Sequence, residues 1–106
     1  MIASQTIALQ KDPPAVKLPV ELLREYVGRY ATSSDNILTL SLRNGQLMAQ
    51  STGQKQARPI MAELPDVLFT PGQPRVRKII QRDAKGRVIA IISRREGRDV
   101  IMQRLR

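Results

Sequence analysis

Turns at regular intervals are the feature of this sequence that most constrains its fold. Over the last two thirds of the chain, short β-favouring segments alternate with Gly- or Pro-containing turns roughly every ten residues. In segment 38–42, leucines alternate with Thr39 and Ser41, which gives one buried and one wetted face. Asn44-Gly45 follows and favours a tight hairpin, because such a turn needs positive φ at both residues. The pattern predicts an antiparallel β-meander that forms a small barrel or a sandwich.

About seven to eight strands and one short helix are expected in this mostly β chain. The segments with strand character are a stretch that begins near Tyr30, then 36–42, 46–51, 57–64, 66–70, 75–82, 87–95 and 99–105. The helix is predicted within "LPVELLREYVG", where Pro19 suits the first turn and Gly28 ends it. A chain of 106 residues is one domain by size. We therefore expect a single domain over 18–106, preceded by a lead-in or linker over 1–17 that contains a Pro-Pro pair.

The residue inventory argues against an enzyme. The chain has no His and no Cys, which removes His-based catalytic triads, thiol nucleophiles, disulfides and thiolate metal sites. The nine acidic residues show no metal-ligand spacing, and no Gly-rich phosphate loop is present. Segment 52–55 places Thr52 where a Ser-x-x-Lys nucleophile motif needs serine. We predict no catalytic residue, no metal and no cofactor.

Positive charge is concentrated near the C-terminus. The formal net charge is +9, and residues 75–106 hold 11 of the 18 Lys and Arg residues but three of the nine acidic ones. Such a surface attracts anions, and a basic β-domain that binds polyanions through residues 75–106 is one hypothesis. Nucleic acid is disfavoured as the partner, because this region has no aromatic residue on which bases could stack. No run approaches the roughly 18 apolar residues that a membrane-spanning helix needs.

Two pairs of adjacent cations are the candidate anion-binding residues: Arg77 with Lys78, and Arg94 with Arg95. A regular strand would turn either Arg77 or Lys78 toward the interior. A bulge or a snorkelling side chain at a barrel end is the favoured interpretation of this pair. The alternative is a buried cation that needs a carboxylate partner or an anionic ligand. A small barrel can also be just wide enough for one ligand, so a small-ligand carrier is a further hypothesis.

An ordered set of motifs resembles a known family. "LPVELLREYVGRY", "LTLSLRNGQLMAQSTGQ", "IIQRDAKGRV" and "REGRDVIMQRL" occur in this order over roughly residues 18 to 106. Together they resemble the C-terminal domain of unknown function that follows the catalytic domain in many bacterial β-lactamase-related and penicillin-binding-protein-like serine hydrolases. The resemblance implies a lipocalin-like meander in which Tyr26 and Tyr30 anchor the helix against the barrel mouth.

The resemblance also implies a role. It makes the chain a non-catalytic accessory domain that packs on, or gates, a serine-hydrolase-type catalytic domain in cis or in trans. Homo-oligomerisation is a further expectation, and a periplasmic or secreted location is favoured because many such hydrolases are exported. The hydrolase motifs themselves belong to the upstream domain of the family.

Overall fold

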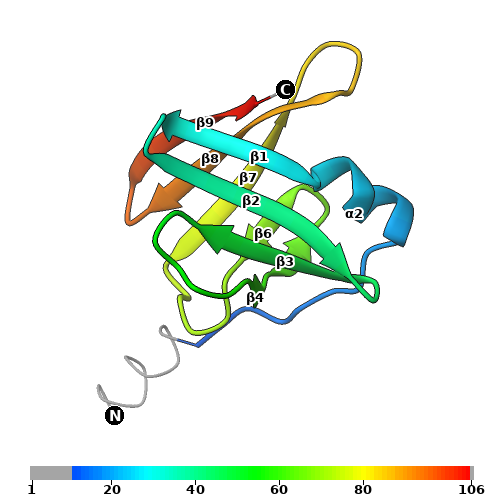
Figure 1. Cartoon of the computed structure of the whole chain (residues 1–106). Helices are drawn as coiled ribbons and strands as arrows, with labels where there is room; N and C mark the ends of the chain where they lie inside the picture. The colour runs from blue at the N-terminus through cyan, green and yellow to red at the C-terminus, as the bar shows by residue number, and fades with distance from the viewer. Residues whose placement is uncertain (1–10, 106) are drawn as a thin grey trace.

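A computed structural model, which describes residues 11–105, shows one short helix and nine strands in a single antiparallel sheet (Figure 1). The elements are α2 Val20–Tyr26, β1 Gly28–Ser33, β2 Asn36–Arg43, β3 Gln46–Ser51, β4 Arg58–Pro59, β5 Met61–Leu64, β6 Val67–Phe69, β7 Val76–Arg82, β8 Val88–Arg95 and β9 Arg98–Leu105. The sheet order is β4-β3-β2-β1-β9-β8-β7-β6-β5. The meander therefore returns on itself where β9 pairs with β1, and the sheet forms a nearly closed barrel. The predicted mostly β fold with one short helix is confirmed.

The expected count of seven to eight strands was wrong, because the predicted strand 57–64 is broken at Ile60. Its first part, β4, pairs with β3, and its second part, β5, pairs with β6. Pro59 has no amide hydrogen to offer the ladder, whereas Ile60 donates its own to the carbonyl of Leu47 (3.0 Å). One bent stretch thus joins the two edges of the sheet, and it counts as two strands.

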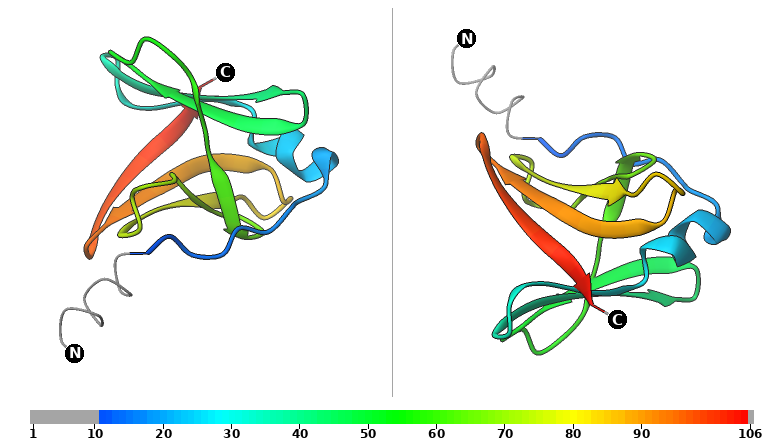
Figure 2. Two further views of the ribbon diagram at one scale, coloured as in Figure 1. Left: turned by 90° about the horizontal axis from the view of Figure 1, so that it is seen from below. Right: turned by 90° about the horizontal axis from the view of Figure 1, so that it is seen from above.

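The barrel is flattened into two layers. Figure 2 shows β1, β2 and β3 facing β6, β7 and β8, while β9 crosses between the layers on one side and the β4–β5 stretch crosses on the other. The core lies between the layers and is aliphatic apart from two tyrosines. Its most buried aliphatic members include Leu40, Leu47, Ile60, Leu68 and Ile91.

We call one end of this barrel the closed end, where α2 lies with the β2–β3 turn (44–45) and the β5–β6 turn (65–66). Tyr26 and Tyr30 are fully buried there, and the Tyr30 hydroxyl donates to the carbonyl oxygen of Tyr26 (2.7 Å). Both tyrosines belong to the main core cluster, together with Leu23 of the helix. They anchor the helix against the barrel, and burial of this kind is worth several kcal/mol for an aromatic side chain.

A charged network continues from the tyrosines at the closed end. The Tyr26 hydroxyl donates to Asp66 Oδ1 and accepts from the Asp66 amide, both at 2.8 Å. The Arg82 guanidinium donates to both carboxylate oxygens of Asp66 (2.9 and 3.0 Å) and to Glu25 Oε1 (2.6 Å). Burial, followed by the hydrogen bond to Asp66, raises the pKa of Tyr26 to about 12. The hydrogen bonds from Arg82 lower the pKa of Asp66 despite its partial burial. The helix is thus tied to the β5–β6 turn and to β7.

Local sequence sets the element boundaries near this end. β1 begins at Gly28, two residues before the predicted start near Tyr30. A Cβ at Gly28 would lie 3.0 Å from Arg104 Nε, so the small residue makes room for the arginine of β9. The predicted hairpin at Asn44-Gly45 is confirmed, with φ of 52° and 80° at the two turn residues.

The described part of the lead-in runs along the outside of the barrel. The Val16 amide donates to the carbonyl oxygen of Ala62 (2.8 Å), and the Asp12 carboxylate accepts from the amide of Gly72 (3.0 Å). Residues 1–10 of the predicted 1–17 lead-in lie outside the described residues. Within 11–105, no helix has the length and apolar character required to cross a bilayer.

Candidate anion-binding site

We call the opposite end of the barrel the open end; it carries the β3–β4 loop (52–57), the β6–β7 turn (70–75) and the β8–β9 turn (96–97). Alternate residues of β7 point inward toward this end: Val76 and Ile80 are buried, and Lys78 lies between them. β7 pairs with β8 without a bulge here, so Ser93 lies directly opposite Lys78 and Arg95 directly opposite Val76. The bulge favoured for this position is therefore absent. The irregularity in this pairing lies further along, opposite Gln81 and Arg82, where β8 carries the extra residue Ile89.

A cavity of about 220 Å³ opens between these strands. It is lined by Leu38, Ala49, Ser51, Gln54, Arg58, Pro59, Thr70, Gln73, Lys78 and Arg95. Three of these side chains are cationic, and Ser51 and Thr70 contribute hydroxyl groups. Among the residues that the structure describes, no Asp or Glu lines this cavity. Aliphatic Leu38 and Ala49 form part of its wall, so the cavity combines a positive lining with an apolar surface.

Lys78 is the innermost cation of this cavity, because it lies on the inner face of β7 next to core residues. Its ammonium group donates one hydrogen bond, to Ser93 Oγ at 3.3 Å. It forms no ion pair with any carboxylate in 11–105. Burial lowers the pKa of Lys78, and the nearby positive charge of Arg95 lowers it further. An anion in the cavity would relieve both penalties.

The adjacent arginines of β7 and β8 point outward and are neutralised. Arg77 Nε donates to Glu63 Oε1 (2.8 Å), and its guanidinium lies 5.8 Å from the centre of the Phe69 ring. Arg94 makes a two-pronged ion pair with Asp99 at 2.8 and 3.0 Å. Of the four predicted anion-binding residues, the structure therefore brings Lys78 and Arg95 together in the cavity and places Arg77 and Arg94 on the outer face.

Sequence reasoning missed Arg58, the third cation of the cavity. It lies in β4, 20 positions before Lys78, and enters through the pairing of β4 with β3. A signal was present, since Arg58 belongs to a predicted strand whose alternation places it on the same face as Ile60. Its significance depended on knowing which strands are neighbours in space, and spacing along the chain did not show that.

Much of the remaining basic charge is paired within the protein. The ion pairs of residues 75–105 are Arg75–Glu96, Arg77–Glu63, Arg82–Glu25, Arg82–Asp66, Arg87–Asp83 and Arg94–Asp99. Arg104 instead donates to the carbonyl oxygens of Val27 (2.6 Å) and Val88 (3.1 Å). The cavity at the open end thus brings together three cations that form no ion pair within 11–105; Lys78 is partly buried, and Arg58 and Arg95 are exposed.

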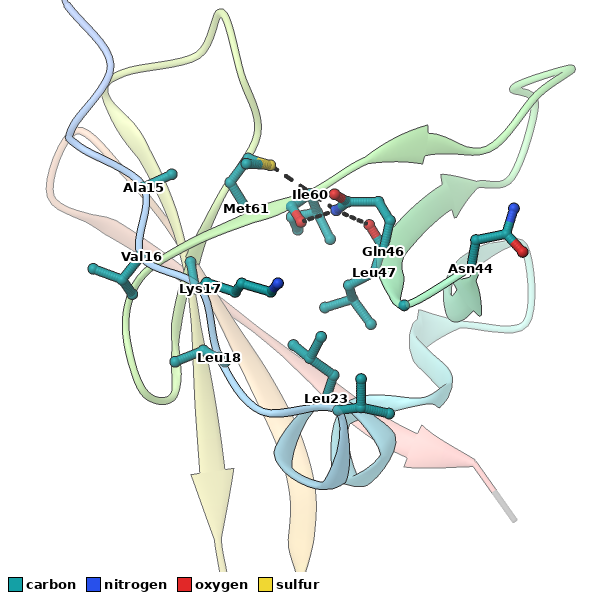
Figure 3. A pocket seen from close by; sticks show the side chains of 13 residues that line it. Ala15, Val16, Lys17, Leu18, Leu23, Asn44, Gln46, Leu47, Ile60 and Met61 are labelled. Carbon is teal, nitrogen blue, oxygen red and sulfur yellow. Dashed lines mark hydrogen bonds between the residues drawn. The ribbon is translucent and has the colours of Figure 1, made fainter.

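A larger hollow of about 530 Å³ lies between the lead-in, α2 and the β2–β3 turn (Figure 3), and the core residues Leu47 and Ile60 are among those that line it. Its wall is mostly aliphatic, and Figure 3 shows Val16, Leu18 and Leu23 along it. The Gln46 amide group is already engaged, donating to the carbonyl oxygens of Leu47 (2.9 Å) and Ile60 (3.2 Å). This groove has the greater volume, but the open-end cavity has the convergent polar groups that usually fix a ligand.

No known family model matches this chain, and no curated protein matches its sequence. The resemblance to C-terminal domains of serine hydrolases therefore remains a prediction from the ordered motifs. The same holds for the accessory role, the partner domain and the location that the resemblance implies.

Proposed function

We propose that this chain is a non-catalytic binding domain that takes a small anion into the open end of its barrel. The observation that carries the proposal is that Arg58, Lys78 and Arg95 line one cavity. No Asp or Glu among residues 11–105 lines it with them. A partly buried cation lacking a counter-ion is unfavourable, and a bound anion supplies the missing partner. The hydroxyl groups of Ser51 and Thr70 add donors that suit a carboxylate or a phosphate.

The pattern of ion pairs favours a compact anion over a polyanion. A polyanion needs a continuous row of free cations on the surface. In the C-terminal region, Arg75, Arg77, Arg82, Arg87 and Arg94 each already bind a carboxylate of this protein. The cations that remain unpaired at the cavity lie around one small space, with Lys78 partly buried in it and Arg58 and Arg95 exposed at its edge. This arrangement suits a ligand small enough to enter the space.

An NMR titration with inorganic phosphate tests this function. We expect saturable shifts of the backbone amides of Ser51, Arg58, Lys78 and Arg95. The variant Lys78→Gln should weaken binding roughly tenfold or more, because a charge-assisted hydrogen bond in a partly buried site is lost. Arg77→Gln is the matched control: it removes the same charge one residue away, but from the outer face.

The control decides between a site and a general charge effect. Weakening of less than about twofold in Arg77→Gln, beside the large effect of Lys78→Gln, would support the cavity as the binding site. Equal weakening by the two variants, or shifts spread evenly over the basic surface, would overturn the proposal. Arg94→Gln beside Arg95→Gln repeats the comparison on β8.

A further inference from the structure

Lys78 differs from the other lysines of this chain in its surroundings. The other four, Lys11, Lys17, Lys55 and Lys85, are exposed to solvent. Lys78 lies on the inner face of the barrel, partly buried, with Arg95 and Arg58 lining the same cavity. Glu96 is near Arg95 in sequence, but its carboxylate is bound to Arg75 (3.2 Å). Burial and the nearby positive charge of Arg95 both favour the neutral amine, which is the nucleophilic form of lysine.

We propose that Lys78 captures small anionic carbonyl compounds, of the 2-oxo acid class, as a reversible imine. This inference rests on the proposed anion-binding function and names the ligand class of that same site. A 2-oxo acid carries a carboxylate and a ketone or aldehyde on adjacent carbons. With its carboxylate held by the guanidinium groups of Arg58 and Arg95, the neighbouring carbonyl carbon is presented to Lys78 Nζ.

The chemistry balances without an added oxidant or reductant. The lone pair of neutral Nζ attacks the carbonyl carbon and forms a carbinolamine. The two amine protons then leave with the carbonyl oxygen as water, and a C=N bond replaces the C=O bond. The Ser93 hydroxyl, 3.3 Å from Nζ, is placed to donate to the carbonyl oxygen or to relay a proton. Hydrolysis reverses the capture, so the step is binding and requires no turnover.

The size and wall of the cavity limit the ligand. About 220 Å³ accommodates a short molecule, and aliphatic Leu38 and Ala49 favour a small alkyl group beside the carbonyl. Pyruvate combines these features and is the probe for the test. Lactate is its matched analogue, because it has the same carboxylate and methyl group but an alcohol in place of the ketone.

Reductive trapping tests the inference. The full chain is incubated with pyruvate and cyanoborohydride near neutral pH, and adducts on the five lysines are mapped by mass spectrometry. We expect Lys78 to be labelled at least about tenfold faster than each exposed lysine, because a cationic cleft concentrates anions by that order. Inorganic phosphate should slow labelling of Lys78 alone. Arg95→Gln should slow it as well, whereas Arg94→Gln should leave it unchanged.

The pH profile and a charge-retaining variant add readouts that a merely structural lysine would not give. Labelling of Lys78 should begin to rise at a lower pH than is usual for a lysine, and Arg95→Gln should move the Lys78 profile toward higher pH. Lys78→Arg should still bind lactate in an NMR titration, whereas its labelling by pyruvate should be confined to the four exposed lysines at their slow wild-type rates.

The outcomes separate this inference from the proposed function. Lactate or phosphate binding at the cavity without preferential labelling of Lys78 would overturn the inference and leave the anion-binding function standing. Even labelling of all five lysines would also overturn it. Absence of binding by lactate and by phosphate, together with absence of Lys78 labelling, would overturn both proposals.

Discussion

The two ends of this barrel differ in how their charged side chains are paired. At the closed end, Tyr26, Asp66 and Arg82 satisfy one another's hydrogen bonds and tie the helix to the sheet. At the open end, Lys78 and Arg95 line the same cavity, and none of the residues 11–105 that line this cavity is an Asp or Glu. The paired network at the closed end stabilises the fold, whereas the unpaired cations at the open end destabilise it. The comparison indicates that stability is concentrated at one end of the molecule and ligand recognition at the other.

The largest expected effect is at the closed end. Tyr26→Ala should lower the free energy of unfolding by about 3–5 kcal/mol, because it empties a fully buried aromatic position and removes the hydroxyl from Asp66. Urea denaturation followed by circular dichroism measures it. If the truncation Lys78→Ala at the open end were as destabilising as Tyr26→Ala, the contrast between the two ends would fail.

An intermediate effect is expected from Asp66→Asn, at about 1–3 kcal/mol near neutral pH, because Arg82 would lose one of its two carboxylate partners and keep only Glu25. The folded state lowers the pKa of Asp66, so its stabilisation is present above the ordinary aspartate pKa and is lost as the pH falls through the lowered value. The difference in free energy of unfolding between wild type and variant should therefore disappear below about pH 4. Urea unfolding at a series of pH values checks this, and a gap that is constant with pH would contradict it.

The smallest effect has the opposite sign. Lys78→Met should raise stability by about 1 kcal/mol near neutral pH, because a partly buried cation without a counter-ion is replaced by an apolar chain. The folded state lowers the pKa of Lys78. The destabilisation caused by its charge is therefore complete below that lowered pKa, and it disappears as the pH rises to the ordinary lysine value of about 10.4. The gain should disappear over the same range, as thermal melts at neutral and alkaline pH would show.

Arg77→Met is the matched control for this last change. It removes a cation of similar size from the neighbouring position, where the guanidinium binds Glu63 and covers Phe69. It should destabilise the protein where Lys78→Met stabilises it. If both variants changed the free energy of unfolding in the same direction, the interpretation of the cavity as a place of unpaired charge would be wrong.

Local patterns were sufficient to predict most of the fold. The Asn44-Gly45 turn, the helix before Gly28 and the alternation of 38–42 each depend on neighbours a few residues away, and each is found in the structure. The break at Ile60 was not predictable in this way. It arises because one stretch must pair with β3 at one end and β6 at the other, which only the closed sheet imposes.

The site was predictable in part for a related reason. Alternation required either Arg77 or Lys78 to face inward, but the choice depended on how β7 pairs with β8. Likewise, Glu63 and Asp99 decide which arginines are neutralised, and nothing in the spacing showed that Glu63 lies beside Arg77. Arg58 enters the cavity from a distant strand, so its contribution is a property of the folded sheet.

The alternation of β7 also limits how this sequence can change. Successive residues of a strand point to opposite faces, so sliding β7 by one residue would turn Lys78 outward and bring a neighbour such as Arg77 into the cavity. The composition and net charge of the protein would be the same, yet both the pair with Glu63 and the lining of the cavity would be lost. Substitutions can adjust this cavity gradually, whereas an insertion or deletion within the strand would erase it in one step.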